Sequence, residues 1–346
     1  MNALSAALNA VDDVAAEGDL KASARESDGL ELEPVGDPVE LPDGRRIYPP
    51  ALFGRPIHEI ACELLDHDDP SRSRFLRLVG PPGTGKSQVA RLIAHHRWTA
   101  AGRDVELRDG RPFYGLVELQ PGPSSDEYFF RYDYVPVPDS DRVQLVDAAF
   151  VEAMRNGWLV VIDEVNLARD VALLSINATL DGRLTLHLPA TNETVIAQPG
   201  FGVLLAYNPG LVGASDIPDA WRSRFPAAVE VTSNWPALLQ MGAPERLVQA
   251  ARDLDQERFA GDSGLVWTPQ FRDIEALWDM AERVGERWAI ALWMSNVQEQ
   301  VETGNLQPAE ASAVARMLDE AGYGRYRVSE SGGVANLNGY PRAVTR

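Results

Sequence analysis

The chain has very little lysine. Of its 32 lysines and arginines only Lys21 and Lys86 are lysine, so the other 30 basic residues are arginine. Acidic residues outnumber basic ones by 51 to 32, and the net charge is −19 at pH 7. A broad nucleic-acid footprint needs clustered lysine and arginine, so nucleic acid is a possible but not a favoured partner. A local arginine-lined pore remains compatible with this charge.

Cysteine and long apolar runs are also scarce. Cys62 is the only cysteine, which excludes an intramolecular disulfide and a cysteine-based metal site. No apolar run approaches the ~20 residues that span a membrane. The first twenty residues lack the basic and apolar segments of a secretory signal. From these absences we expect a cytoplasmic protein with no membrane partner.

Strand-like and helical patterns alternate in the middle of the chain. Apolar runs of strand length lie at 75–79, 114–119, 158–163 and 201–208. The alternation predicts an α/β fold with a doubly wound, mainly parallel sheet. Two alternating runs around a polar tip predict a hairpin over 184–197.

Helical spacing links several of these runs. One helix face is predicted for Leu145, Val146, Ala149, Phe150, Ala153 and Met154, and a second helix runs from Val171 to the Asp181-Gly182 turn. Beyond Trp235 the pattern is purely helical, over 236–254, 269–284 and 285–302. We therefore predict four parts: an acidic, partly ordered arm (1–44), an α/β nucleotide-binding domain (45–232), an all-α domain (233–322) and a tail (323–346).

Residues 80–87, GPPGTGKS, match the pattern GxxxxGK[ST] in full. Such a loop surrounds phosphate oxygens with backbone N–H groups, and the helix that follows adds its partial positive charge. Lys86 is expected to reach the β- and γ-phosphates, and the Ser87 hydroxyl to bind Mg²⁺. A compact ammonium differs from a planar guanidinium in such a role, which accounts for a lysine here; the alternative is a chance glycine-rich turn. The predicted nucleotide contacts are Gly80, Pro81, Pro82, Gly83, Thr84, Gly85, Lys86, Ser87 and Gln88.

Two acids end the apolar run at 158–163. A phosphate loop of this kind needs a further Mg²⁺ contact at the end of a nearby strand, and Asp163 is placed to supply it. Glu164 is then the candidate general base that polarises the attacking water. The alternative is an ordinary strand that ends in solvated acids.

With both motifs in view, the chain resembles the AAA+ ATPases. GPPGTGKS together with DEVNLA (163–168) is similar to the MoxR and dynein-related branch, and AYNPG (206–210) resembles the CbbQ/NirQ/NorQ group. The resemblance covers roughly residues 45–285. It implies a P-loop AAA+ sheet with a C-terminal helical lid, and ATP and Mg²⁺ as ligands, with GTP as the alternative nucleotide.

The resemblance also implies roles for single residues. Asn208 would orient the attacking water. Arg224, in the segment AWRSRF, would be the arginine finger that acts on the neighbouring subunit, with Arg222 as the second choice and a surface arginine paired with Asp219 as the alternative. Arg272 would be the sensor-2 arginine of the lid, although it lies two residues later than the common Pro-Arg form. The alternatives are an ordinary helix-cap arginine for Arg272 and a polar group at a strand end for Asn208.

The segment 120–142 makes the spacing between Lys86 and Asp163 long. In this branch, insertions near that point form loops that face the ring pore. Its aromatic residues could grip a polypeptide there, or pack beneath the loop. They are Tyr128, Phe129, Phe130, Tyr132 and Tyr134.

An active site divided between subunits implies a closed ring, by resemblance a homo-hexamer. Two functions stay open. The first is a chaperone-like motor of the MoxR type that activates a partner protein with the help of a von Willebrand factor A protein. The second is an NTP-driven motor of a DNA-processing or defence complex, similar to McrB. A nucleotide-dependent scaffold with little turnover is a third possibility.

Overall fold

The computed structural model describes residues 36–52, 54–66, 74–138, 141–208, 217, 219–261, 263–324, 326–328 and 334–336. The chain divides into the units 1–34 and 35–346, and all of these residues lie in the second. Most of the predicted N-terminal arm and C-terminal tail, and Pro209 and Gly210 of the AYNPG motif, therefore lie outside the described residues. In the described part, no helix has the length and apolar character needed to cross a bilayer.

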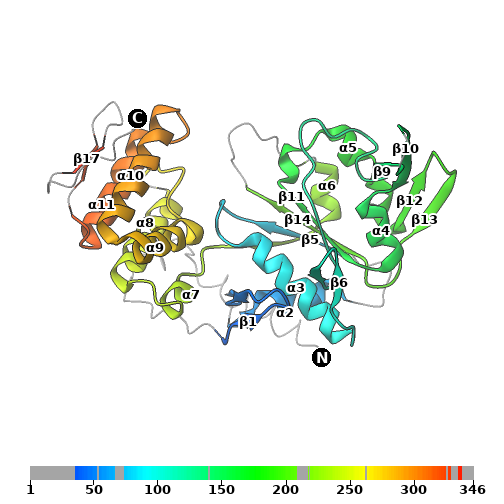
Figure 1. The fold of residues 1–346 in the computed structure, drawn as a ribbon, viewed down its shortest axis with the longest axis horizontal. Helices are drawn as coiled ribbons and strands as arrows, with labels where there is room; N and C mark the ends of the chain where they lie inside the picture. Colours follow the sequence, from blue (N-terminus) through cyan, green and yellow to red (C-terminus); the bar gives the residue numbers. More distant parts are fainter. Residues whose placement is uncertain are drawn as a thin grey trace, which may run out of the picture. The chain divides into compact units, whose positions relative to one another are not determined.

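A five-stranded parallel sheet forms the centre of the α/β part (Figure 1), with the strand order β15-β5-β14-β11-β8. Its strands are β5 (Phe75–Val79), β8 (Leu116–Leu119), β11 (Leu159–Asp163), β14 (Gly202–Tyr207) and β15 (Ala227–Glu230). This confirms the predicted parallel α/β fold. The central strands β11 and β14 are almost entirely apolar and buried, as expected where helices cover both faces of a parallel sheet.

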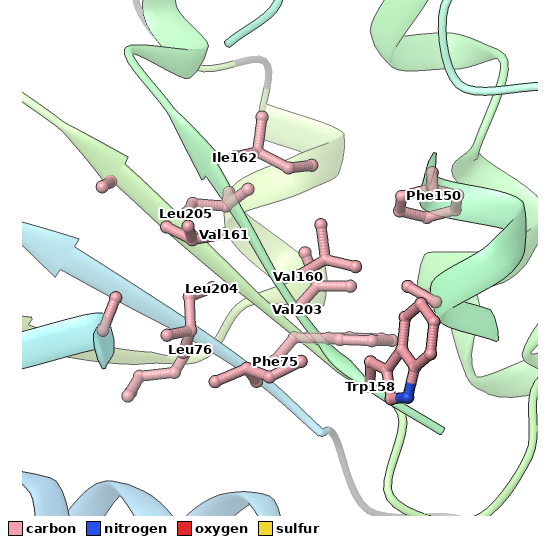
Figure 2. Packing of buried hydrophobic residues seen from close by; sticks show 14 of the residues in the cluster. Phe75, Leu76, Phe150, Trp158, Val160, Val161, Ile162, Val203, Leu204 and Leu205 are labelled. Carbon is pink, nitrogen blue, oxygen red and sulfur yellow. The ribbon is translucent and has the colours of Figure 1, made fainter. Parts of the chain in front are cut away.

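Helices flank this sheet on two sides in Figure 1. On one side lie α2 (Ile57–Leu65) and α3 (Lys86–Ala100), and on the other α4 (Ala149–Asn156) and α6 (Asp219–Arg224). Figure 2 shows Phe150 of α4 and Trp158 close to the sheet residues Val160 and Val203. Phe150, Val160 and Val203 are fully buried, so the two layers share a dry apolar core.

Short two-stranded elements surround the sheet. The predicted hairpin at 184–197 is confirmed as β12 and β13. The remaining pairs are β1 with β2, β3 with β4, β6 with β7, β9 with β10 and β16 with β17. Their bounds are β1 Val39–Glu40, β2 Arg46–Ile47, β3 Ala51–Leu52, β4 Arg55–Pro56, β6 Glu106–Arg108, β7 Arg111–Phe113, β9 Tyr132–Pro136, β10 Val143–Asp147, β12 Thr185–Leu188, β13 Glu193–Ile196, β16 Tyr326–Val328 and β17 Val334–Asn336.

The C-terminal part is helical, as predicted. It consists of α7 (Trp235–Gln240), α8 (Glu245–Ala260), α9 (Phe271–Val284), α10 (Glu286–Glu302) and α11 (Pro308–Glu320). The helix predicted over 236–254 is in fact two, α7 and α8. They separate at Gly242, whose φ of 97° suits glycine, and at Pro244, which precedes the first residue of α8.

Two other predicted helices were partly wrong. Leu145 and Val146 lie in β10, which pairs along its whole length with β9, and α4 begins only at Ala149. Their helical spacing was coincidental, because the hydrogen-bonded partner strand decides the conformation. The helix predicted from Val171 to the Asp181-Gly182 turn is interrupted rather than continuous: α5 (Asp170–Leu174) is followed by a turn and then by the π-helical segment Thr179–Arg183, whose helical backbone breaks at Asp181 and Gly182.

Candidate functional site

The phosphate loop connects β5 to α3 at the carboxyl edge of the sheet. Val79 of β5 lies beside Tyr207 of β14, and Ala206 of β14 lies beside Asp163 of β11. Parallel strands bring the residues that follow them to one edge. The register therefore places the phosphate loop, Asn208 and the Asp163-Glu164 pair next to one another, although more than 120 residues separate the first from the second along the chain.

Two glycines fit the loop to its surroundings. Gly85 precedes α3 with a φ of 97°, a left-handed conformation that favours glycine. A Cβ at Gly80 would lie 2.3 Å from the carbonyl oxygen of Val231, so a side chain there would force the loop away from the end of β15. The pattern GxxxxGK[ST] is thus required by both backbone shape and space.

Lys86 is the first residue of α3, and only 8% of its surface is exposed. Its Nζ donates hydrogen bonds to Gly80 O at 2.8 Å, Pro81 O at 2.7 Å and Asn208 Oδ1 at 2.5 Å. Burial lowers the pKa of Lys86 to about 8, from an ordinary value of 10.5. The neighbouring carboxylates of Asp163 and Glu164 act in the opposite direction. The ammonium is therefore held at the mouth of the loop by neutral oxygens, in a position that an anion would stabilise.

The two predicted Mg²⁺ ligands are in contact. Ser87 Oγ donates a hydrogen bond to Asp163 Oδ2 at 3.2 Å, from the first turn of α3 to the end of β11. A hydroxyl and a carboxylate oxygen are suitable ligands for Mg²⁺, which is typically held by a few protein oxygens, waters and substrate phosphates. Ser87 and Asp163 therefore fit the metal that the motif implies.

Glu164 has an unusual backbone conformation for its residue type. Its φ of 50° and ψ of 36° lie in the left-handed region, which a residue other than glycine adopts at a cost. Its carboxylate Oε2 accepts a hydrogen bond from Gln120 Nε2. Gln120 follows β8, whose Leu119 lies beside Ile162 of β11. Backbone and side chain together hold the carboxylate at the sheet edge beside Asp163.

Asn208 joins this group through two contacts. Its side chain accepts from Lys86, and its main-chain oxygen accepts a hydrogen bond from Asn166 Nδ2 at 3.2 Å. Asn166 and Asn208 are both buried. The sequence reasoning gave Asn166 and Gln120 no role. Asn166 could have been found in the quoted DEVNLA motif, whereas the neighbourhood of Gln120 depends on pairing between strands that are distant in sequence.

A pocket of about 230 Å³ lies beside the loop. The residues that line it come from the segment before α2, the phosphate loop, α3, α7 and the turn after it, and α9. They include Ile47, Tyr48, Gln88, Met241 and Phe271. Gln88 Oε1 is buried and has no hydrogen-bond partner among the described residues. A pocket that combines apolar and polar side chains next to a phosphate loop is suited to the base and sugar of a nucleotide.

Arg272 also lines this pocket. Its backbone N donates to Gly83 O at 3.2 Å, and its charge lowers the pKa of Lys86, after the larger effect of burial. The structure therefore brings Arg272 to the phosphate loop, despite its departure from the common spacing.

Arg222 and Arg224 lie elsewhere, on α6. Arg222 is exposed and Arg224 is half-buried. The charge of Arg224 helps to lower the pKa of Asp181, after the larger effect of Arg183. The pKa of Lys86 responds to the charges of Asp163, Arg272 and Glu164. The side chain of Asp219 lies outside the described residues.

The aromatic residues of the insertion separate into two groups. Phe130 and Tyr132 are buried. The ring of Phe130 packs edge-on against the ring of Phe150, and the two ring centroids are 5.4 Å apart. Tyr132 Oη accepts a hydrogen bond from the backbone N of Ala190 at 2.8 Å. Tyr134 is 65% exposed and Tyr128 is 39% exposed. Of these four residues, Tyr128 and Tyr134 are accessible to a polypeptide in a pore, whereas Phe130 and Tyr132 are not.

Comparison with known families supports the same interpretation. Residues 76–225 match the family model described as AAA domain (dynein-related subfamily). The match begins in β5 and ends at Phe225, just after α6, so it includes the loop, the acids of β11 and both arginines of α6. It supports an AAA+ ATPase domain in this part of the chain.

Similar proteins occur in several bacteria. An uncharacterized protein of Staphylococcus aureus (strain USA300) is 37% identical over 156 residues, which are 44% of this chain and 54% of that protein. The uncharacterized protein YojN of Bacillus subtilis (strain 168) is 30% identical over 152 residues, 43% of this chain and 44% of YojN. The chain thus spans about half the length of the curated relatives it matches.

One solved structure, a protein of Cytophaga hutchinsonii, aligns with 75% of this chain and 78% of its own. The sequence identity is 13% and the TM-score is 0.37. A similarity of this size has no bearing on the site.

Proposed function

We propose that the protein hydrolyses ATP with Mg²⁺. One observation carries this proposal: the ammonium of Lys86, the Ser87–Asp163 pair and the carboxylate of Glu164 meet at one edge of the sheet, from β5, α3 and β11. A phosphate-binding loop, a metal-binding pair and a base are the parts that phosphoryl transfer to water requires.

Each part has a separate task. The phosphate loop and Lys86 bind the phosphates, and the pocket beside Gly83 and Gln88 holds the nucleoside. When bound, Mg²⁺ neutralises phosphate charge, and Ser87 and Asp163 would hold it. Glu164 accepts the proton of the attacking water, and Asn208 orients that water from the end of β14.

Arg224 completes the proposed site from a second copy of the chain. Within one chain its charge acts on Asp181. An arginine that stabilises the charge of the transferred phosphoryl group raises kcat strongly, so its supply by a neighbour makes turnover depend on assembly. We propose a closed ring of identical subunits, by resemblance a hexamer.

The proposed ring is a MoxR-type motor that remodels or activates a partner protein, together with a von Willebrand factor A protein. The resemblance of AYNPG to the CbbQ/NirQ/NorQ group supports this choice, and the net charge of −19 favours a protein client over nucleic acid. A motor of a DNA-processing or defence complex is the alternative that the experiment must separate.

The test uses Glu164→Gln, which should bind ATP without hydrolysing it and so retain its client. The tagged variant, loaded with ATP and Mg²⁺ in extract of its host, is purified, and its partners are identified by mass spectrometry and nucleic-acid staining. The control is Lys86→Ala/Glu164→Gln, which should retain nothing. A von Willebrand factor A protein would support the chaperone function, whereas a nuclease or bound DNA would replace it.

Hydrolysis is tested separately on the unmodified chain. Phosphate release should rise well above background with saturating ATP and Mg²⁺, and stop when EDTA removes the metal. Release at background level under these conditions would refute the motor and leave a nucleotide-dependent scaffold.

A further inference from the structure

A buried polar cluster lies where α9 begins. Its members are Ser233, Asp255, Thr268 and Gln270, each at most 6% exposed. Asp255 Oδ1 accepts hydrogen bonds from Thr268 Oγ1 and Gln270 Nε2, both at 2.8 Å, and from Arg258 at 2.9 Å. A buried carboxylate is tolerated only when it is paired and hydrogen-bonded, and here both conditions are met.

Gln270 is the residue that connects this cluster to the α/β part. Its Nε2 donates to Asp255 of α8, while its Oε1 accepts from Ser233 Oγ at 2.9 Å, in the segment between β15 and α7. Ser233 Oγ in turn accepts from the backbone N of Phe271 at 2.9 Å. One amide group therefore links α8, the start of α9 and the segment that leaves the sheet.

The same segment touches the phosphate loop directly. The backbone N of Arg272 donates to Gly83 O, and a Cβ at Gly83 would lie 3.4 Å from Arg272 Cβ and 3.5 Å from Gln270 Cβ. Gln270 and Arg272 thus lie against one glycine of the loop. A movement of Gln270 would therefore shift the backbone that places Arg272 beside Gly83.

Helix α11 shows that capping alone does not require this cluster. Gln307 caps α11 with the same capping box that Gln270 forms at α9, with an acid at the third position in each: Glu310 and Asp273. Gln307 is exposed, whereas Gln270 is 1% exposed. The side-chain bonds of Gln270 to Asp255 and Ser233 therefore exceed what a helix cap needs.

We infer that Gln270 is a positioning residue that holds Arg272 at the phosphates of the bound nucleotide. Asp255 fixes the amide from α8, Ser233 fixes it from the α/β part, and the start of α9 transmits that position to Gly83 and Arg272. This inference rests on the proposed ATP hydrolysis, and it assigns a role to a residue that does not itself contact the nucleotide.

The test is a double-mutant cycle of Gln270→Leu and Arg272→Ala on the full chain. Kd for a fluorescent ATP analogue and kcat for phosphate release are both measured, below the melting temperature of every variant. Gln270→Leu should lower kcat about tenfold or more, because small misplacements of a positioned group have effects of this size. The double variant should be no worse than Arg272→Ala within about twofold, since Gln270 acts through Arg272.

Gln307→Leu is the matched control. It removes the same kind of cap from α11, so it should lower the melting temperature and leave Kd and kcat unchanged. A purely structural role for Gln270 would make Gln270→Leu behave like Gln307→Leu, or make its effect multiply with that of Arg272→Ala. Either result would overturn the inference, as would an Arg272→Ala variant with unchanged Kd and kcat.

Failure of the proposed hydrolysis would be recognised separately. If the unmodified chain binds the analogue but releases no phosphate, the ATPase proposal is wrong, and the same cycle is judged on Kd alone. Non-additive changes in Kd would then still support the positioning role, and additive changes would refute it.

Discussion

The phosphate-loop edge of the sheet and helix α6 differ in how complete they are within one chain. At the loop, Lys86, Asp163 and Glu164 lie together and are held by hydrogen bonds from several elements. On α6, Arg222 is exposed and Arg224 is half-buried, and the charge of Arg224 acts on Asp181. We propose that the Arg224 of one copy acts at the phosphate loop of another.

The difference between the two regions predicts that turnover, but not nucleotide binding, depends on assembly of the subunits. Binding depends on groups that a single subunit already brings together, so it should occur in the isolated subunit. In the proposed mechanism, turnover also requires Arg224 from a neighbouring subunit. Substitutions on the two sides should therefore separate binding from hydrolysis.

Lys86→Ala should have the largest effect, because it removes the only ammonium at the loop from a buried position. We expect nucleotide affinity to fall more than about 100-fold, or roughly 2.7 kcal/mol. Titration with a fluorescent ATP analogue measures it. Lys21→Ala changes the other lysine of the sequence and serves as the control; equal affinities of Lys86→Ala and the unmodified protein would refute the phosphate site.

Glu164→Gln should lower kcat about 100- to 10,000-fold, the range expected for loss of a general base. Nucleotide affinity should change little, since the amide keeps the size of the side chain. Phosphate release and analogue binding are compared on the same preparation. A kcat within threefold of the unmodified protein would remove Glu164 from the role of base.

Arg224→Ala should leave binding nearly intact and lower kcat about 100-fold or more, as removal of an arginine finger does. Arg222→Ala, two residues away on the same helix, is the matched control and should keep its activity. Mixing Arg224→Ala with Lys86→Ala subunits should restore part of the turnover, because each supplies what the other lacks. If Arg222→Ala loses activity instead, the role moves to Arg222.

The smallest expected effect is a pH dependence of binding. In the free protein the pKa of Lys86 is lowered to about 8, and phosphate charge favours the protonated form. Above pH 8, binding must therefore take up a proton, so affinity should fall with rising pH, by at most tenfold per unit. Calorimetry at pH 8.5 in two buffers of different ionisation enthalpy measures this uptake. Binding without proton uptake would show that Lys86 is already fully charged there.

The sequence alone could predict the local parts of the site. The strand, loop and helix around Lys86 follow from adjacent residues, and so does the pair of acids after β11. Gln120 and Gln270 could not be found in this way. Gln120 meets Glu164 only because β8 pairs with β11, and Gln270 becomes significant only when α8 and the segment after β15 close around it.

The errors have the same origin. Leu145 and Val146 fit a helical face, but the partner strand β9 places them in β10. The boundaries of the α/β and helical parts, the ring and the role of the insertion stay predictions, since each depends on contacts that sequence periodicity does not contain.

Two aromatic residues give α6 a further property. The rings of Trp221 and Phe225 stack on each other with their centroids 5.9 Å apart. The ring centroid of Phe225 lies 5.3 Å from that of Phe75, the first residue of β5. Strand β5 then runs about 16 Å to the phosphate loop, at roughly 3.3 Å per residue. Arg224, between these aromatics in sequence, is therefore anchored to the strand that carries its own subunit's loop. In the proposed ring, a movement of the phosphate loop in one subunit would therefore also move the Arg224 of that subunit. The active site of the neighbour would then depend on whether the first subunit has bound nucleotide.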